Sequence, residues 1–246
     1  IIKTTSLIGG ASAISLLLGM VRMKSAALLI GPAGVGLVGA YLVVQDMVGT
    51  VAGLGIRQSA VRGIAEAVGK KDDKAIAGIV VSLRRICWVT GIVGMIAMVL
   101  LAGPLSQYTF ETADYTLDIA MLGPIIFFAT IQSGQVALLQ GMRRIGDLAR
   151  LSIIGAAVGT IVTVALYSWL GLRGIIPSLV LIAIIQLIAT WYFSRRVILS
   201  KVQQTWKESF QTADTMIRLG LVFMWSGLIA ALVAYLTRAW ISQELD

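Results

Sequence analysis

The stretch ALLIGPAGVGLVGAYLVVQD, residues 27–46, decides between two folds for this chain. Gly34, Gly36 and Gly39 spell out G-x-G-x-x-G, which binds a dinucleotide when a strand precedes it, a helix follows it and an acidic residue lies about 20 positions later. The nearest acid, Asp46, comes only seven residues after Gly39. The alternative is a tight turn at the proline and its flanking glycines, joining two apolar helices. The composition of the chain favours this turn.

The composition is that of a membrane protein. Of the 246 residues, 58% are hydrophobic and 13% are charged, and the mean hydropathy is +0.90, whereas soluble domains contain about 25% charged residues. A helix needs about 20 mostly apolar residues to cross a bilayer. Seven segments meet this condition: 7–30, 35–56, 86–103 (with a possible start at 76), 117–139, 151–170, 175–193 and 217–240. The sequence therefore predicts an all-α, multi-pass helix bundle whose short connections leave no room for a soluble catalytic domain.

Lysine and arginine residues alternate between the two ends of the predicted spans. Sixteen of the 20 lie on the side that holds the N-terminus, and only Arg173 and Arg238 lie on the opposite side. An excess of positive charge marks the cytoplasmic loops of membrane proteins, so we expect the N-terminus in the cytoplasm and the glycine-proline turn outside. This distribution assigns the net charge of +8 to membrane topology rather than to binding of nucleic acid.

Two segments on the predicted cytoplasmic side have patterns of their own. In residues 201–216, Trp206, Phe210 and Ala213 recur at helical spacing among polar residues, which favours an amphipathic helix along the inner leaflet; a polar linker is the alternative. The run GKKDDK, residues 69–74, is expected to form a solvated turn between two short helices. Because the chain lacks an initiator methionine and stops soon after the seventh predicted span, we expect a fragment of a longer protein.

Side chains for acid-base or metal chemistry are scarce. The chain has no histidine and one cysteine, Cys87, which we expect to be a small buried apolar residue. Without histidine the chain lacks the commonest general base and metal ligand. We expect neither a cofactor nor a metal.

Arg22 is the clearest ionisable residue inside the first predicted span. It ends a stripe of small and polar residues that follow steps of three and four: Thr5, Gly9, Ser12, Ser15 and Gly19. A cation at the bilayer centre costs about 2.5–3.5 kcal/mol, so this face should pack on other helices or line a watery cavity. Lys24 points about 200° away on an ideal helix, among apolar neighbours, and its flexible chain can reach the outer interface; a kink would reverse this ranking.

Asp46 and Arg57 share one face of the second predicted span, because eleven residues make three turns plus about 20°. We interpret Asp46 as a functional acid and Arg57 as a second cation of the site. Two alternatives remain open: Asp46 and Arg22 form an ion pair that only joins two helices, and Arg57 is an ordinary anchor at the inner interface.

Amide side chains lie in two later predicted spans. Gln132 and Gln135 on the fourth span and Gln186 on the sixth are able to donate hydrogen bonds to sugar hydroxyls or to one another. The fifth span contains G-x-x-x-G at 155–159, which close helix packing explains without a ligand.

Three stretches resemble the lipid-linked oligosaccharide flippases of bacterial O-antigen and related surface polysaccharide (lipopolysaccharide) synthesis. They are KSAALLIGPAGVGLVGAY at 24–41, LLQGMRRIGDLARLS at 138–152 and IRLGLVFMWSGLIAALVAYLTRAWIS at 217–242. Such flippases belong to the multidrug/oligosaccharidyl-lipid/polysaccharide exporter superfamily. The resemblance implies about twelve or more spans in two six-helix lobes around a cavity that opens alternately to either side. It divides the chain into residues 1–200 as an N-terminal six-helix lobe, 201–216 as an inter-lobe linker helix and 217–246 as the first helix of a truncated second lobe.

The resemblance also implies a substrate, undecaprenyl diphosphate carrying an oligosaccharide repeat unit, which moves to the outer leaflet of the bacterial inner membrane. A polysaccharide polymerase is an expected partner. In related flippases basic residues on the first two helices serve the diphosphate, and the matching positions here are Arg22 or Lys24, and Arg57; Arg218, at the start of the seventh span, is a further candidate. Transport of this kind needs no covalent chemistry, so we do not expect an enzyme.

Other functions compete with this interpretation. An ion-coupled exporter of drugs or small organic cations from the same superfamily would have a cavity dominated by acids, whereas cations outnumber Asp46 here. A membrane transferase would show a His-Asp pair or spaced carboxylates near one interface, but Asp72 and Asp73 are adjacent. A purely structural subunit is the third possibility. The driving force stays open between the membrane potential and sodium or proton coupling through Asp46.

Overall fold

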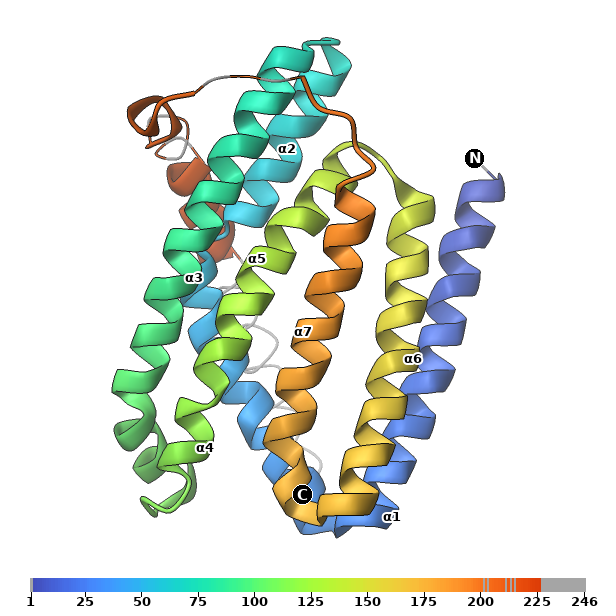
Figure 1. The fold of residues 1–246 in the computed structure, drawn as a ribbon, viewed down its shortest axis with the longest axis vertical. Helices are drawn as coiled ribbons and strands as arrows, with labels where there is room; N and C mark the ends of the chain where they lie inside the picture. Colours follow the sequence, from blue (N-terminus) through green and yellow to red (C-terminus); the bar gives the residue numbers. More distant parts are fainter. Residues whose placement is uncertain are drawn as a thin grey trace, which may run out of the picture.

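The computed structural model describes residues 2–200, 202, 204–210, 212, 214 and 216–226. Within these residues the chain is almost entirely helical and has no strand, which confirms the all-α class. The helices are α1 (Ile2–Gly53), α2 (Ile56–Gly69), α3 (Asp73–Phe110), α4 (Thr116–Ala120), α5 (Leu122–Gly141), α6 (Ile145–Leu170) and α7 (Ile175–Ser194), with a 3₁₀ turn η1 (Gly171–Gly174) before α7. Figure 1 shows an elongated bundle. We call the end that holds the N-terminus, α2 and the start of α3 its N-terminal end.

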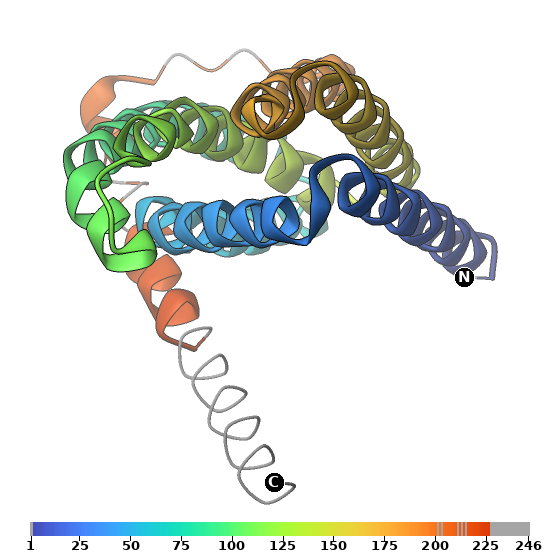
Figure 2. The same cartoon turned by 90° about the horizontal axis from the view of Figure 1, so that it is seen from below.

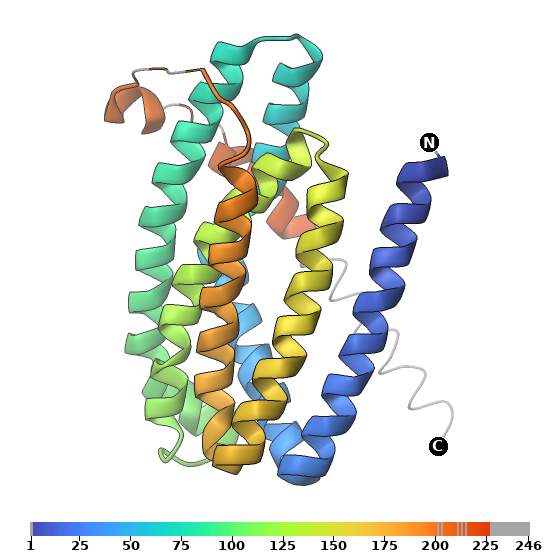
Figure 3. The same ribbon diagram turned by 45° about the vertical axis from the view of Figure 1, so that its right-hand side comes forward.

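Helix α1 passes along the bundle twice because it is broken at Gly31 and Pro32. Gly31 has φ 70° and ψ 177°, a conformation that glycine adopts without steric cost, and Pro32 has no backbone N–H to continue the helix. The first half of α1 runs away from the N-terminal end and the second half returns to it (Figures 1 and 3). This confirms the predicted turn and excludes the dinucleotide interpretation, because a helix rather than a strand precedes the glycines.

A second reversal joins α6 to α7 through η1. Gly171 has φ 56°, and a Cβ atom at Gly174 would lie 2.5 Å from the carbonyl oxygen of Leu166, so this turn also depends on glycine. Among the described residues, four helical stretches are long and apolar enough to cross a membrane: Gly9–Gly53, Asp73–Phe110, Thr116–Gly141 and Ile145–Ser194. The first and last of these fold back on themselves, so the described chain supplies six passes that match the first six predicted spans.

Helices α2 and α3 extend the N-terminal end of the bundle. The turn between them begins after Gly69 and confirms the solvated turn predicted for GKKDDK; Asp72 caps α3 by accepting a hydrogen bond of 2.9 Å from the backbone N–H of Ala75. Helix α3 has 38 residues, or about 57 Å at 1.5 Å per residue, and therefore projects beyond a hydrocarbon layer of about 30 Å. It begins at Asp73, three residues before the earlier of the two starts predicted for the third span, so Arg84 and Arg85 lie within a continuous helix.

The buried side chains form two clusters along the bundle. One joins both halves of α1 to α3, α4, α5 and α7 and is centred on residues such as Tyr41, Met98 and Leu122. The other, nearer the N-terminal end, joins α2, α3, α5 and α7 around residues such as Ile64 and Leu139. Seen from below in Figure 2, α1 lies along one side of the bundle and α5 and α7 along the other.

The chain after α7 crosses the N-terminal end of the bundle. Arg85 of α3 holds this segment: it donates hydrogen bonds to the backbone oxygens of Gln204 and Thr205, each at 3.0 Å, and to Oγ of Ser209 at 2.6 Å, and its guanidinium stacks on Trp206. Residues 206–210 are helical. Their role as a linker between two lobes stays a prediction. Of the seventh predicted span, residues 217–226 are helical, and 227–240 lie outside the described residues.

Candidate functional site

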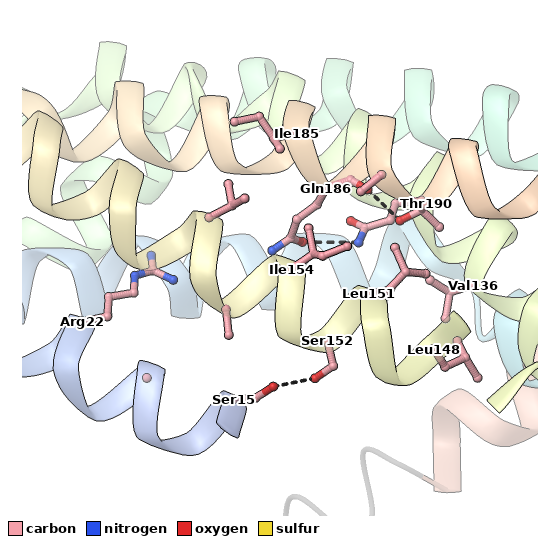
Figure 4. Close-up of a pocket in the computed structure, with 16 residues that line it drawn as sticks. Ser15, Arg22, Val136, Leu148, Leu151, Ser152, Ile154, Ile185, Gln186 and Thr190 are labelled. Atoms are coloured by element: carbon pink, nitrogen blue, oxygen red, sulfur yellow. Dashed lines mark hydrogen bonds between the residues drawn. The ribbon is translucent and has the colours of Figure 1, made fainter. Parts of the chain in front are cut away.

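A cavity of about 470 Å³ lies between the first half of α1 and helices α5, α6 and α7 (Figure 4). We call it the Arg22 cavity. Its polar lining comes from four elements: Ser15 and Arg22 of α1, Gln132 of α5, Ser152 of α6, and Gln186 and Thr190 of α7. Aliphatic side chains of α5, α6 and α7, including Val136, Leu151 and Ile185, fill the rest of the wall. The volume falls in the range of about 300–1,000 Å³ of ordinary ligand pockets.

Arg22 supplies the charge of this cavity. Its side chain is half-buried and extends from α1 toward α6 (Figure 4), where Gly159 leaves it room: a Cβ atom at residue 159 would lie 3.2 Å from Nη1 of Arg22. Among the residues whose side chains are described, Arg22 forms neither an ion pair nor a hydrogen bond. Its guanidinium therefore keeps its donors available in a partly desolvated place, where they bind an anion more strongly than in water.

Hydrogen bonds hold the polar wall in place. Oγ of Ser15 and Oγ of Ser152 lie 2.9 Å apart across the α1–α6 contact. Nε2 of Gln132 donates to Oε1 of Gln186 at 3.3 Å, and the hydroxyl of Thr190 donates to the carbonyl oxygen of Gln186 at 2.6 Å. The glutamines thus bond one another, as one of the two sequence interpretations expected. Their remaining amide donors and acceptors can still bind hydroxyl groups.

A second cavity of about 380 Å³, the Arg143 cavity, continues the first toward the N-terminal end of the bundle. Both are lined by Leu148 and Ser152, so they lie end to end along α6. Arg143 and Gln140 line the second cavity, and Arg57 donates a hydrogen bond of 3.4 Å to Oε1 of Gln140. Two cations therefore lie at the cavity that adjoins the Arg22 cavity at Leu148 and Ser152.

The structure brings only some of the sequence candidates together. Arg22 and Gln132 line one cavity, and Arg57 approaches the adjoining one. Lys24 is exposed and does not line the Arg22 cavity. Gln135, three residues from Gln132, lines a different cavity between α3, α5 and α7.

The remaining two candidates lie elsewhere. Asp46 is exposed on the second half of α1, and among the described residues no ion pair joins it to Arg22, so the two helices are not linked in that way here. Arg218 is also exposed, and its Nε lies 2.8 Å from Oδ2 of Asp214. As substrate ligands, both stay predictions.

Sequence reasoning missed Arg143, which we assigned only to the positive cytoplasmic charge. The signal that could have found it is its place in the short connection between α5 and α6, two helices that line both cavities. The glycines of the G-x-x-x-G motif also leave room for polar side chains of the cavity. A Cβ atom at residue 155 would lie 3.4 Å from Nε2 of Gln186, and residue 159 faces Arg22. Among the described residues, no three histidine, cysteine, aspartate or glutamate side chains gather as a metal site would require.

The chain is similar to a known protein family in sequence and to a solved transporter in fold. A model of the family described as polysaccharide biosynthesis protein matches residues 1–243. No curated protein matches the sequence. The fold is similar to a solved MOP superfamily transporter from Pyrococcus furiosus, described as having a binding pocket of reverse polarity that suggests a different function. The TM-score is 0.73 at 16% identity, over 95% of this chain and 54% of that one. The chain thus spans about half the length of the transporter whose fold it shares.

Proposed function

The chain belongs to the polysaccharide biosynthesis protein family, and from that premise we propose that it forms the N-terminal lobe of a flippase for lipid-linked oligosaccharides. The substrate is a polyprenyl diphosphate, such as undecaprenyl diphosphate, that carries a sugar repeat unit. The protein carries it from the cytoplasmic to the outer leaflet of the bacterial inner membrane for synthesis of a surface polysaccharide such as O-antigen. The N-terminal end of the bundle is then the cytoplasmic end, and a polymerase uses the product.

The guanidinium of Arg22, which has no partner among the described side chains, carries this proposal. An arginine at membrane depth costs about 2.5–3.5 kcal/mol, and here no acidic side chain of the cavity offsets that cost. A bound diphosphate offsets this cost, because its oxygens accept paired hydrogen bonds from the guanidinium of the arginine. The polyprenyl tail stays in the lipid, so only the charged head group needs the polar path.

The adjoining cavities support a route for this head group. Arg57 and Arg143 attract the diphosphate at the cytoplasmic end, and Arg22 receives it deeper along α6. Ser152 lies where the two cavities adjoin, and Gly159 faces Arg22. These two residues are seven positions apart on α6, which is about 10 Å of helix rise. Arg22 therefore lies deeper along the bundle than Arg57 and Arg143. The amides of Gln132 and Gln186 and the wall hydroxyls provide hydrogen-bond partners for sugars. Movement of two lobes against each other then exposes the site to either side in turn.

The test is complementation of a bacterium that lacks its own flippase. The full-length protein is expressed as wild type and with Arg22→Ala, Arg57→Ala or Asp46→Ala, and surface polysaccharide is measured at matched membrane abundance. We expect Arg22→Ala to abolish most of the polysaccharide and Arg57→Ala to reduce it. Arg150→Ala, which removes an exposed arginine at the same end, is the control. Full polysaccharide with both Arg22→Ala and Arg57→Ala would overturn the assignment of the site.

The alternative function is export of drugs or small organic cations by the same superfamily. It requires an acid in the cavity, and the only membrane-depth acid of the sequence candidates, Asp46, does not line the Arg22 cavity. Sensitivity of the same strains to cationic dyes distinguishes the two: the exporter hypothesis expects Asp46→Ala to raise sensitivity while the polysaccharide is unaffected.

A further inference from the structure

A groove on the side of the bundle away from α1 has features of a second binding site. It is a cavity of about 490 Å³ between α3, α5 and α7, and we call it the lateral groove. Two arginines, Arg84 and Arg195, line it together with aromatic, aliphatic and amide side chains: Trp88, Phe127, Phe128, Ile131, Gln135, Leu187, Ile188 and Trp191. None of these residues lines the Arg22 cavity or the Arg143 cavity. The groove is therefore a separate site from the proposed transport path.

The two arginines are free to bind an anion. Among the described residues, neither Arg84 nor Arg195 has a hydrogen bond or ion pair from its guanidinium, although Arg195 is positioned by stacking 4.4 Å from the ring centre of Trp191. Their sequence neighbours differ: Arg85 is held by the segment after α7, and Arg196 donates a hydrogen bond to the hydroxyl of Tyr192. In each adjacent pair, one arginine (Arg85 or Arg196) makes contacts within the protein, and the other (Arg84 or Arg195) lines the groove.

The apolar part of the groove is open to its surroundings. Trp88 and Trp191 are 54% and 50% exposed, and Ile188 is 57% exposed. The ring of Trp88 packs edge-on against Phe127, with centroids 5.3 Å apart. Tryptophan and arginine together are typical of the boundary between hydrocarbon and head groups, and Arg195 directly follows α7 at the N-terminal end of the bundle. The arginine end of the groove therefore lies at the height of the lipid head groups of one leaflet.

Gln135 adds a hydrogen-bond acceptor without a partner. Its Oε1 is buried and unpaired in the part of the chain that the structure describes. A buried polar atom without a partner destabilises the fold, so a ligand that donates a hydrogen bond to it binds more strongly. A hydroxyl group next to the anion of the ligand meets this need.

The helix that follows α7 packs on another side of the bundle than the lateral groove. Gly220, in the helix at Met216–Ser226, packs directly against the backbone of Leu54 and Gly55, where α1 meets α2. This contact lies on the side of α1, whereas α5 and α7 lie on the opposite side of the bundle (Figure 2).

We propose that the lateral groove binds an anionic phospholipid of the leaflet at the N-terminal end of the bundle. The head-group phosphate accepts hydrogen bonds from Arg84 and Arg195, and a head-group hydroxyl donates to Oε1 of Gln135. One acyl chain lies against Ile131 and Ile188. The lipid is a bound component of the lobe rather than a transported substrate, and the proposal does not depend on the proposed function.

Brominated lipids test this because bromine on an acyl chain quenches tryptophan fluorescence at short range, and Trp88 and Trp191 lie in the groove. The full-length protein is reconstituted in vesicles of phosphatidylcholine with increasing fractions of brominated phosphatidylglycerol, and in parallel with brominated phosphatidylcholine. We expect quenching to saturate at a lower fraction of the anionic lipid, and the preference to fall about tenfold or more with Arg84→Gln plus Arg195→Gln. An arginine near the membrane surface contributes about fivefold, or about 1 kcal/mol.

Matched variants separate the groove from general surface charge. Arg62→Gln plus Arg196→Gln removes two exposed arginines from the same end and should keep the preference. Trp88→Phe plus Trp191→Phe should remove the saturable part of the quenching. Gln135→Leu should weaken the binding of phosphatidylglycerol more than that of phosphatidic acid, which lacks the hydroxyl groups of a head-group glycerol. Equal quenching by the two brominated lipids in the wild type, or equal loss in both double-arginine variants, would overturn the proposal.

Discussion

Replacing Gly159 by alanine tests whether Arg22 must sit where the structure places it. The new Cβ atom would lie 3.2 Å from Nη1 of Arg22, closer than an ordinary contact. Because the guanidinium is the far end of a flexible side chain, it should shift by a fraction of an ångström and leave the fold intact. A hydrogen bond from arginine to a charged oxygen contributes about 1.5–3 kcal/mol. Losing about a third of it, roughly 0.5–1 kcal/mol, weakens binding about two- to fivefold.

The assay is binding of farnesyl diphosphate, a short polyprenyl diphosphate, to the purified protein by isothermal titration calorimetry. Gly103→Ala is the control, because it adds the same methyl group to α3 where nothing lies within 4 Å, and it should bind like the wild type. Thermal unfolding of Gly159→Ala should match the wild type. Unchanged affinity in Gly159→Ala would refute the role of Arg22 as a ligand of the diphosphate, since the guanidinium cannot keep its position beside the new methyl group.

Three further substitutions test the packing of the lobe by thermal unfolding in detergent. Gly141→Ala should destabilise the bundle by about 1–3 kcal/mol, because the Cβ atom would lie 2.7 Å from an isoleucine side chain of α2; an unchanged melting temperature would contradict this contact. Tyr41→Phe removes a hydrogen bond of 2.6 Å to Oδ2 of Asp118 and should cost about 1.5–3 kcal/mol, and stability equal to the wild type would show that this bond is not made. Lys70→Ala should leave the melting temperature unchanged, because its ion pair with Glu66 is exposed and such pairs contribute little; a clear loss would contradict the exposed placement.

The passes of the bundle could be predicted because local chemistry determines them. Apolar runs fix where a helix can cross the membrane, and Gly31 with Pro32 fixes the first reversal. The turn before Asp73 could likewise be predicted from its charged residues. The full length of α3 could not be predicted. Its polar first turns are stabilised by α2 and by the segment after α7 that Arg85 binds, and that segment is distant in sequence.

The faces of the helices were harder to predict than their ends. Helical periodicity separates Arg22 from Lys24, and the structure places only Arg22 in the cavity. The same argument could not tell which of Gln132 and Gln135 points toward that cavity, because both lie on a helix buried on several sides. The prediction that Asp46 and Arg57 share one helix face was wrong, because Leu54 and Gly55 have positive φ angles and separate α1 from α2. Asp46 is exposed, since the faces against which α1 packs are set by α3 and α6.

Transport by variants of two neighbouring cations tests the role of Arg22 in isolation. Arg22→Gln and Lys24→Gln remove the same charge from the same helix two residues apart, and only Arg22 lines the cavity. Each full-length protein is reconstituted in vesicles with a fluorescent lipid-linked oligosaccharide, and the rate of its appearance in the other leaflet is measured. We expect Arg22→Gln to lower the rate by about tenfold or more, from the loss of at least 1.4 kcal/mol of binding, and Lys24→Gln to lower it by less than twofold. Equal rates in the two variants would contradict a diphosphate path through the Arg22 cavity.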